Sequence, residues 1–462
     1  MMKMRSVVIV FLILLVILIL FIFVDMKDDS TIEDKNFKIE EINIPESPQS
    51  DNIIRNKFVA KTEPNSCLIS SELGCKMVDG STIYNKIKNS VVMISVDNKW
   101  QGTGFFVNNE GYICTAAHVI STTVDPEKET GALIPASNVF VLVSPSYHVY
   151  KCRVVGFDGA GDIGVIKIDE NDPYNKNLPK IENNEYLKFS DNVKTGNLAF
   201  VLGYPLGTDI SSFSMGIIRN ENFVAPSLFL PFNLVLVTTP AYQGNSGSAI
   251  VNSNGEVVGL LTFVYFSKEQ TYESIGGGPS KDIVSFVVDS IIKGDKGNDP
   301  HFDKRTKKFK KGFLGVGASK IVWFSDLPVI SNKYKFPEIR PIGFRGQIEK
   351  NGKSDFSKLI KPTDIITKIN GTNIGALPDQ KAPGTVLWKL LPGDTVTIDY
   401  YTIENNKYIL KKDVQLKLQS FPDELDTFEG RSLKVEINCS DDDCSLASGF
   451  TELPEPSKPI GF

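Results

Sequence analysis

From Ser81 to Ile292 the sequence is a series of short β-branched and aromatic runs separated by Gly, Asn and Asp. Many short runs at close spacing, each bounded by turn residues, are typical of a β-sandwich or β-barrel. Apolar residues over Asp282–Ile292 have helical spacing, and we expect that helix to close the domain. The expected strands are Val91–Val96, Gly104–Val107, Val139–Val143, Arg153–Gly156, Ile163–Ile168, Leu198–Leu202, Leu234–Val237, Ala249–Val251 and Val257–Phe263.

A second unit rich in expected strands begins at Gly312 and contains one helical stretch, Thr385–Leu391. The basic run Lys304–Lys311 precedes it, and we interpret that run as a solvated linker, with a membrane-surface or nucleic-acid patch as the alternative. The tail from Phe421 is acidic and contains proline, so it is expected to be irregular. The expected strands of the second unit are Phe313–Val316, Gly346–Glu349, Asp364–Ile369, Thr395–Tyr401 and Val414–Leu418.

The amino terminus contains an unbroken apolar run, Val7–Val24, with Lys3 and Arg5 before it. As a helix rising about 1.5 Å per residue this run spans about 27 Å, close to the thickness of a bilayer core. A cleaved signal peptide is the alternative, but its apolar region is shorter and small residues follow it. We therefore expect an uncleaved, single-pass anchor with a cytoplasmic amino terminus and everything after Asp25 outside the cytoplasm.

These features divide the chain into a tip and anchor (1–24), a polar stalk (25–80), a first β domain (81–295), a basic linker (296–311), a second β domain (312–420) and an acidic tail (421–462). The net charge of −5 argues against a general nucleic-acid binder. Cys67/Cys75 and Cys439/Cys444 could each close a small disulfide loop in an oxidising compartment. All six cysteines could also be free thiols, and Cys114 and Cys152 fall inside apolar strands.

One small-residue turn, Gln243–Ser248, lies between two expected strands and contains Ser246. Glycine on both sides of the serine allows a tight turn that directs successive backbone N–H groups toward one point. Such amides are what an oxyanion hole requires, and the Ser246 hydroxyl is placed to attack a carbonyl held there. Most turns of this composition are ordinary loops, so the prediction depends on partners elsewhere in the chain.

A nucleophilic serine needs a base, which is usually a histidine held in one tautomer by a carboxylate. The chain has three histidines. His301 lies in the expected linker and is interpreted as a surface residue, and His148 is expected to be passive at a strand end. His118 follows a strand and the small residues Thr115–Ala117, which allow a backbone to pack beneath an imidazole. A buried structural histidine is its alternative interpretation.

Asp162 is the expected orienting carboxylate, because it opens the apolar strand Ile163–Ile168. A carboxylate at that position is costly to bury unless a donor meets it, and an imidazole N–H is such a donor. Asp158 lies four residues earlier and is interpreted as a turn residue.

The order of these motifs resembles the chymotrypsin-fold serine proteases, specifically the membrane-associated HtrA (Deg) branch. In the second unit, Phe313-Leu314-Gly315-Val316 is similar to the carboxylate-binding loop of a PDZ domain. The motifs that carry the resemblance are Gly102–Phe105, Thr115–Val119, Asp162–Val165, Gly203–Gly207, Gly244–Ser248, Asn254–Gly259, Asp364–Gly371 and Leu391–Val396. Departures from the usual pattern are Gln243, Ser248, Thr238, Leu261 and the insertion Ala318–Pro341.

The resemblance implies a mainly β chain: a double six-stranded β-barrel protease domain and a PDZ domain, preceded by one transmembrane helix. It implies that Ser246 is the nucleophile, His118 the general base and Asp162 its orienting carboxylate. The oxyanion hole falls on Gly244, Asn245 and Ser246, with amides of Gly244 and Ser246 as its donors. No cofactor and no metal are implied.

The function implied is that of an endopeptidase acting on unfolded or damaged proteins outside the cytoplasm, assembled as a trimer or larger homo-oligomer. Its second domain would bind peptide carboxy termini by strand addition, with the terminal carboxylate on the amides of Leu314 and Gly315. Phe313–Val316 could equally be a plain core strand. Two other classes of function stay open: a catalytically silent homologue acting as a chaperone or peptide-binding scaffold, and a structural membrane protein whose β domains only bind partners.

Overall fold

The structure is a computed structural model that describes residues 79–422 with gaps, together with Asp426 and residues 437–440 and 443–446. The gaps are residues 98, 126–129, 182–183, 206–207, 225–231, 266–274, 323–329, 331–332, 337–342, 349–354 and 362. The expected span Val7–Val24 and the pair Cys67/Cys75 therefore lie outside the described residues. Within these described ranges, no helix is long and apolar enough to cross a membrane.

The first β domain begins with a short helix and then forms a closed barrel. Its strands pair in the order β7-β6-β1-β2-β3-β8, and β7 also pairs with β8, which closes the ring. Side chains that point inward, such as Val92, Ile94 and Phe106, are fully buried. The elements are α2 (Gly80–Ile87), β1 (Val91–Val96), β2 (Lys99–Phe106), β3 (Tyr112–Thr115), α3 (Ala117–Ile120), β4 (Ser121–Asp125), β5 (Thr130–Pro135), β6 (Val139–Val143), β7 (His148–Asp158) and β8 (Ile163–Ile168).

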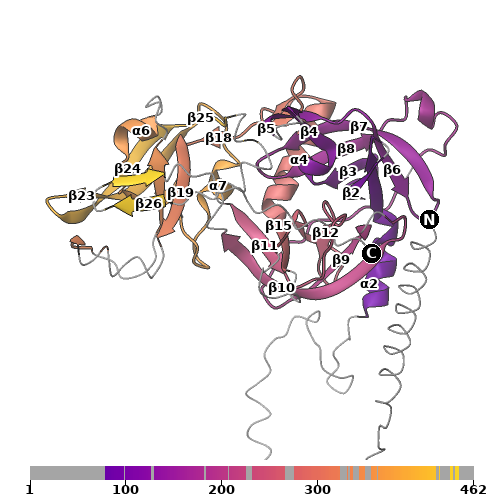
Figure 1. Cartoon of the computed structure of the whole chain (residues 1–462), viewed down its shortest axis with the longest axis horizontal. Coiled ribbons are helices and arrows are strands. Elements are labelled where there is room, and N and C mark those ends of the chain that lie inside the picture. Colours follow the sequence, from indigo (N-terminus) through magenta and orange to yellow (C-terminus); the bar gives the residue numbers. More distant parts are fainter. Residues whose placement is uncertain are drawn as a thin grey trace, which may run out of the picture. The chain divides into compact units, whose positions relative to one another are not determined.

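A second group of strands follows, in the order β13-β12-β9-β10-β11-β15-β14. Figure 1 shows the two groups as separate sets of arrows, indigo to purple for β1–β8 and magenta to salmon for β9–β15. The mainly β architecture expected from the sequence is confirmed. The strands are β9 (Leu198–Gly203), β10 (Ser212–Val224), β11 (Asn233–Val237), β12 (Ala249–Val251), β13 (Val257–Leu260), β14 (Phe263–Tyr265) and β15 (Ile275–Pro279).

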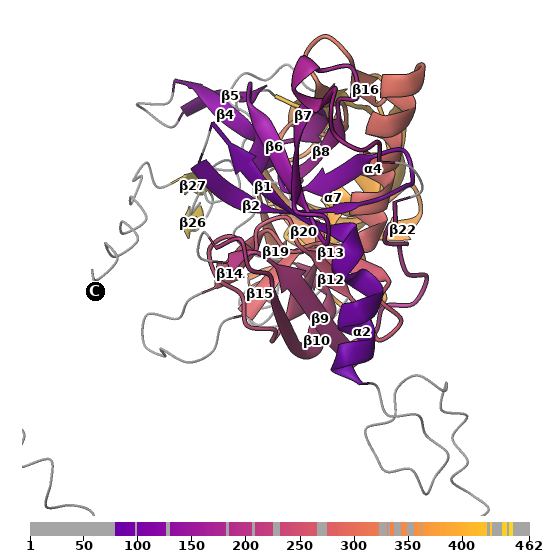
Figure 2. The same cartoon turned by 90° about the vertical axis from the view of Figure 1, so that its right-hand side faces the viewer.

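The expected strand Val257–Phe263 is two strands, because its middle leaves the ladder. The Leu261 carbonyl accepts a hydrogen bond from the Gly247 amide at 2.8 Å, and the Leu261 amide donates to the Ser248 carbonyl at 2.9 Å. These bonds tie the break to the turn that carries Ser246. The expected closing helix is present as α4 (Lys281–Lys296), which lies along β7, β8 and β13 (Figure 2).

The interpretation of Lys304–Lys311 as a solvated linker is right for the exposed side chains of Lys304, Arg305 and Lys310, but the segment is structured and Lys311 is buried. The segment after α4 forms a small hairpin of β16 (Phe302–Asp303) and β17 (Lys308–Phe309), and β17 adds to the edge of β7. Phe302 and Phe309 are buried, and Lys311 is only 1% exposed. His301 is half-buried and stacks on Phe309 with ring centroids 5.6 Å apart. The apolar side chains between the lysines anchor this segment to the barrel.

The second β-rich unit contains the two-stranded pair β18–β25 and a sheet with the order β19-β20-β21-β23-β24, to which β22 adds beside β21. Its core includes Trp388, Phe344, Phe356 and Ile398, all nearly fully buried. The elements are β18 (Gly312–Phe313), β19 (Val316–Val322), β20 (Gly343–Ile348), α6 (Asp355–Leu359), β21 (Ile365–Ile369), β22 (Thr372–Asn373), α7 (Pro383–Leu387), β23 (Thr395–Glu404), β24 (Lys407–Lys417) and β25 (Gln419–Ser420).

The tail is not wholly irregular, contrary to expectation. Strands β26 (Ile437–Ser440) and β27 (Asp443–Leu446) form a hairpin in which Cys439 lies directly opposite Cys444. Nearer the start of the tail, Asp426 is buried, and its carboxylate accepts a hydrogen bond from the Ala160 amide of the first barrel. The acidic composition of the tail predicted neither feature. The hairpin depends on backbone pairing, and the charge of Asp426 is balanced by Lys311, which lies far away in the sequence.

The end of α4 is anchored to the first barrel through Asp295, and this anchor gives a test of stability. Arg153 donates two hydrogen bonds to the Asp295 carboxylate, at 3.0 and 2.6 Å, and the Tyr112 hydroxyl donates a third at 2.7 Å. Burial alone would raise the pKa of Asp295, but the bonds from Arg153 and Tyr112 lower it overall. Asp295→Asn is expected to lower the free energy of unfolding at pH 7 by about 1–2 kcal/mol, since Arg153 is partly solvated.

The sign of the pH dependence follows from the lowered pKa. The stability that the Asp295 carboxylate contributes is complete above its unfolded pKa of about 3.9 and is lost as pH falls through the folded value. Urea unfolding should therefore show that the free energies of unfolding of wild type and Asp295→Asn differ less near pH 3 than at pH 7. Glu110→Gln, which removes only an exposed ion pair to Lys296, is the control and should cost less than about 1 kcal/mol. Equal losses of unfolding free energy in Asp295→Asn and Glu110→Gln would contradict a stabilising role for the Asp295 contacts.

Candidate active site

His118 lies in the single helical turn α3, directly after strand β3. The residues that lead into it, Thr115, Ala116 and Ala117, are fully buried, and their small side chains allow the turn to pack onto the barrel. Strand β3 pairs with β8, so the start of α3 lies beside the start of β8. The chain thereby places His118 next to Asp162, the residue that precedes β8.

Asp162 accepts two hydrogen bonds from His118. Its Oδ1 accepts from the His118 backbone N–H at 2.9 Å, and its Oδ2 lies 2.9 Å from the ring atom Nδ1. Asp162 is fully buried, whereas the His118 side chain is 28% exposed. Because an ionised carboxylate only accepts, Nδ1 carries the ring proton and Nε2 keeps a lone pair. The imidazole is therefore oriented as a base with one face open to solvent.

The backbone of Asp162 adopts a conformation that few residues tolerate. Its φ is +53°, in the left-handed region, and its amide donates to the Gly159 carbonyl at 3.1 Å. Aspartate is among the non-glycine residues that enter this region most readily, and such backbone outliers cluster at functional sites. The turn Asp158–Asp162 thus sets the direction in which the carboxylate points.

Ser246 lies on the turn between β11 and β12, and that turn is held from both barrels. The Thr103 amide donates to the Ser246 carbonyl at 2.9 Å, and the Thr103 hydroxyl donates to the Gly244 carbonyl at 2.8 Å. Gly244 and Gly247 have φ values of +102° and +87°, which explains why glycine is required there. Sequence reasoning missed Thr103, although the glycines on either side of it indicated a close approach.

The serine turn packs directly against the segment that carries His118. A Cβ at Gly247 would overlap the Thr103 carbonyl and the Thr115 hydroxyl and would lie 2.9 Å from the Ala116 amide. Gly102 is the second point of approach, because a Cβ there would lie 2.7 Å from Val119 and 2.8 Å from the Ser246 carbonyl. Residues immediately before and after His118 therefore adjoin residues in and around the serine turn.

Three backbone amides of the serine turn have no acceptor among the described residues: that of Gln243, which is exposed, and those of Gly244 and Ser246, which are buried or partly buried. The intervening amide of Asn245 is different, since it donates to the Tyr242 carbonyl at 3.0 Å. Buried N–H groups are nearly always paired, so the two unpaired amides that are buried or partly buried indicate a place for an anionic oxygen. The Asn245 amide is already bonded, so of the three residues expected at the oxyanion hole only Gly244 and Ser246 have amides left to donate among the described residues.

Of the other residues considered from the sequence, the two histidines pack elsewhere, and Asp158 begins the turn that leads to Asp162. His148 begins β7 opposite Val143, and His301 packs on Phe309. Asp158 does accept a turn hydrogen bond, from the Gly161 amide at 3.1 Å, but it is also fully buried and paired with Lys311. Cys114 and Cys152 are buried free thiols, and burial raises the pKa of both.

The Phe313–Val316 segment has features of both readings considered for it. Phe313 pairs with Gln419 and is buried, as is Leu314. Gly315 has a φ of +88°, and the amides of Leu314 and Gly315 have no acceptor in the part of the chain that the structure describes. Strand β19, which follows, is an edge strand of its sheet in that same part of the chain.

Comparison with known proteins agrees with this geometry. Residues 102–260 match the family model of a trypsin-like peptidase domain. That range contains His118, Asp162 and Ser246. The family match thus covers the serine turn, the histidine and the aspartate together, and it ends where strand β13 ends.

Relatives along a longer part of the chain are named as proteases. A probable periplasmic serine endoprotease, DegP-like, from Chlamydia pneumoniae is 27% identical over 284 residues, covering 60% of this chain and 48% of that protein. Protease Do-like 1, chloroplastic, from Arabidopsis thaliana is 25% identical over 331 residues, covering 70% of this chain and 64% of that protein. This chain therefore spans about half to two thirds of the length of these relatives.

A solved structure of the HtrA-type protease AlgW with a tripeptide is similar in fold. It has a TM-score of 0.51 and 20% sequence identity, and the match covers 74% of this chain and 98% of that chain. The similarity concerns the fold alone, and it supports the chymotrypsin-like arrangement of the two barrels.

Proposed function

We propose that this chain is a serine endopeptidase of the HtrA type. The observation that carries the proposal is the His118–Asp162 pair, hydrogen-bonded through two atoms, beside a turn with a serine and two buried or partly buried amides that lack acceptors. In this proposal Ser246 is the nucleophile, and its Oγ attacks the carbonyl carbon of the peptide bond. The amides of Gly244 and Ser246 donate to the oxygen that becomes negative.

The tautomer of His118 determines the route of the proton in this mechanism. Nε2 of His118 accepts the Ser246 hydroxyl proton during attack and donates it to the leaving amine. Asp162 stabilises the imidazolium through Oδ2 while Oδ1 keeps the His118 backbone in place. Water then attacks the acyl-enzyme by the same route, with His118 as the base again. Each step uses only groups of the chain and water.

The proposal also includes a class of substrate and a cellular location. We infer that the enzyme cleaves unfolded or damaged polypeptides outside the cytoplasm, anchored by Val7–Val24 and assembled as a homo-oligomer. The name of one relative, a probable periplasmic serine endoprotease, supports an extracytoplasmic role. A substrate carboxy terminus would add to the free edge of β19, with its carboxylate on the amides of Leu314 and Gly315.

The test is covalent labelling of the full chain with a fluorophosphonate probe, which reacts with serines activated by a neighbouring base. We expect stoichiometric labelling, and peptide mass spectrometry should locate the adduct at Ser246. Absence of labelling in the folded protein, or an adduct at another serine, would contradict the proposal. The absence of labelling would favour the catalytically silent scaffold instead.

A further inference from the structure

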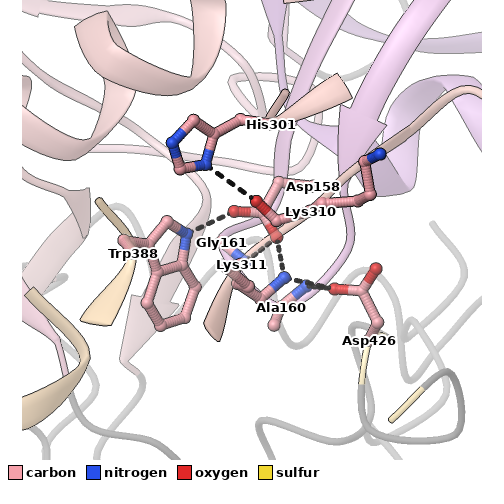
Figure 3. A network of polar contacts seen from close by, with 8 residues as sticks. All are labelled: Asp158, Ala160, Gly161, His301, Lys310, Lys311, Trp388 and Asp426. Atoms are coloured by element: carbon pink, nitrogen blue, oxygen red, sulfur yellow. Dashed lines mark hydrogen bonds and ion pairs between the residues drawn. The ribbon is translucent and has the colours of Figure 1, made fainter. Parts of the chain in front are cut away.

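A buried ion cluster lies at the base of the turn that carries Asp162. Lys311 Nζ is 2.6 Å from Asp158 Oδ1 and 2.7 Å from Asp426 Oδ1, and the Trp388 indole N–H donates to Asp158 Oδ2. Asp158, Lys311 and Trp388 are at most 1% exposed, and Asp426 is 4% exposed. Figure 3 shows these side chains converging, with the Asp426 carboxylate directed at the Ala160 amide. We name these four residues the lysine cluster.

Two of the four members, Trp388 and Asp426, come from parts of the chain far from the first barrel in sequence. Lys311 lies between β17, which adds to β7, and β18, with which the carboxy-terminal unit begins. Trp388 caps α7 and Asp426 follows β25, whereas Asp158 ends β7 and opens the turn Asp158–Asp162. Among the described residues, the side-chain bonds of the lysine cluster therefore join the carboxy-terminal unit to that turn.

The charges explain why the cluster holds together. Burial alone would lower the pKa of the Lys311 ammonium, but the Asp158 and Asp426 carboxylates raise it overall. The aromatic rings of Phe421 and Trp388 lie 4.4 and 5.1 Å from Lys311 Nζ and favour the cation as well. A buried ammonium bonded to two carboxylates has one strongly preferred arrangement, because moving any member leaves a buried charge unpaired.

The turn itself is bonded to the cluster along most of its length. The Ala160 amide donates to Asp426 Oδ1 at 3.0 Å, and the Gly161 amide donates to Asp158 Oδ1 at 3.1 Å. A Cβ at Gly159 would overlap the Asp426 carbonyl, so the tail packs directly on the turn. Four consecutive residues before Asp162 are thus fixed by groups outside the barrel or by Asp158.

We propose that the lysine cluster is a positioning device for the catalytic pair, so that docking of Lys311, Trp388 and Asp426 sets the orientation of Asp162 and through it His118. The proposal rests on the proposed endopeptidase function. Lys311, Asp158 and Asp426 are positioning residues, since none of them touches His118 or Ser246. The competing interpretation is that the lysine cluster only stabilises the contact between the carboxy-terminal unit and the first barrel, without affecting Asp162.

A second contact between the units provides a matched control. The Thr385 hydroxyl donates to Asn233 Oδ1 at 2.7 Å and accepts from the Asn233 amide at 2.8 Å, joining α7 to β11. This contact does not involve the turn Asp158–Asp162. Thr385→Val should weaken docking of the units without touching the turn, whereas Asp426→Ala weakens docking and frees the turn.

The experiment uses the full chain and two readouts, the rate of fluorophosphonate labelling of Ser246 and the low-field proton signal of His118 Nδ1 in NMR. With three histidines in the chain, the signal can be assigned by His118→Gln. We expect Asp426→Ala to slow labelling by about 10- to 100-fold and to weaken the proton signal, since small misplacements of catalytic groups cost about that much. Asp426→Asn retains Oδ1 as an acceptor and should restore both readouts to within about threefold of wild type.

Thr385→Val should leave both readouts at wild-type values at a comparable loss of stability, measured by urea unfolding. If Asp426→Ala does not fold, Trp388→Phe removes the indole donor to Asp158, keeps an aromatic ring beside Lys311 and Phe232, and should give a smaller change in the same direction. Unchanged readouts in the cluster variants, or equal changes in Thr385→Val, would overturn the positioning role. A wild type with the His118 signal but without labelling would refute the endopeptidase function, and the signal alone would still decide the role of the cluster.

Discussion

Replacing Ser246 by alanine is expected to lower the turnover of an unfolded protein such as casein by about 10⁶-fold, the scale seen when the nucleophile of such a relay is removed. The reason is chemical: without Oγ no acyl-enzyme forms, and His118 has no hydroxyl proton to accept. The fold should be unaffected, because the Ser246 backbone is held through its carbonyl, which accepts from the Thr103 amide and which the substitution leaves in place. Turnover of labelled casein by the full chain is the measurement.

Ser248 provides the matched control on the same turn. Its hydroxyl is fully buried and has no hydrogen-bond partner among the described residues, so it is not placed to act as a nucleophile. Ser248→Ala removes the same atom two residues away and should keep turnover within a few-fold of wild type, with equal or slightly higher stability. Equal turnover by wild type and Ser246→Ala would exclude the protease mechanism and favour a binding protein.

Local sequence patterns were sufficient to predict the bounds of strands whose burial is determined by their own apolar residues. Val91–Val96, Ile163–Ile168 and Ala249–Val251 have the predicted bounds, because short apolar runs between turn residues have few other ways to bury their side chains. The pairing of His118 with Asp162 was predictable for a related reason. A carboxylate that precedes a buried strand needs a donor, an imidazole N–H is such a donor, and the chain has three histidines to choose from.

The features that sequence reasoning missed depend on residues far apart in the chain. Lys311 was read as part of a solvated basic run, yet its partners Asp158 and Asp426 are 153 and 115 positions away. Nothing within the run indicates that two carboxylates and an indole N–H will surround one of its lysines. The break after Leu260 is similar, since the Leu261 backbone leaves its strand to bond the serine turn. Charge and apolar spacing describe a segment, but they do not describe its distant partners.

Replacing Asp162 by asparagine is expected to lower turnover by about 10⁴-fold while leaving the fold and the Ser246 turn in place. The two hydrogen bonds of Asp162 determine the outcome. The His118 backbone N–H must donate, so the asparagine carbonyl oxygen takes the position of Oδ1. Its NH₂ group then faces Nδ1, which can only accept from it. The ring proton moves to Nε2, and the imidazole can no longer accept the Ser246 proton.

This argument predicts more than a loss of rate. The low-field Nδ1 proton signal of His118 should disappear in Asp162→Asn, although the ring stays in place, whereas in Ser246→Ala the signal should persist. Asp169→Asn, which changes a partly buried turn carboxylate at the other end of β8, is the control and should alter neither turnover nor the signal. Full turnover in Asp162→Asn would mean that another group orients the histidine. A lost signal with full turnover would mean that His118 is not the base.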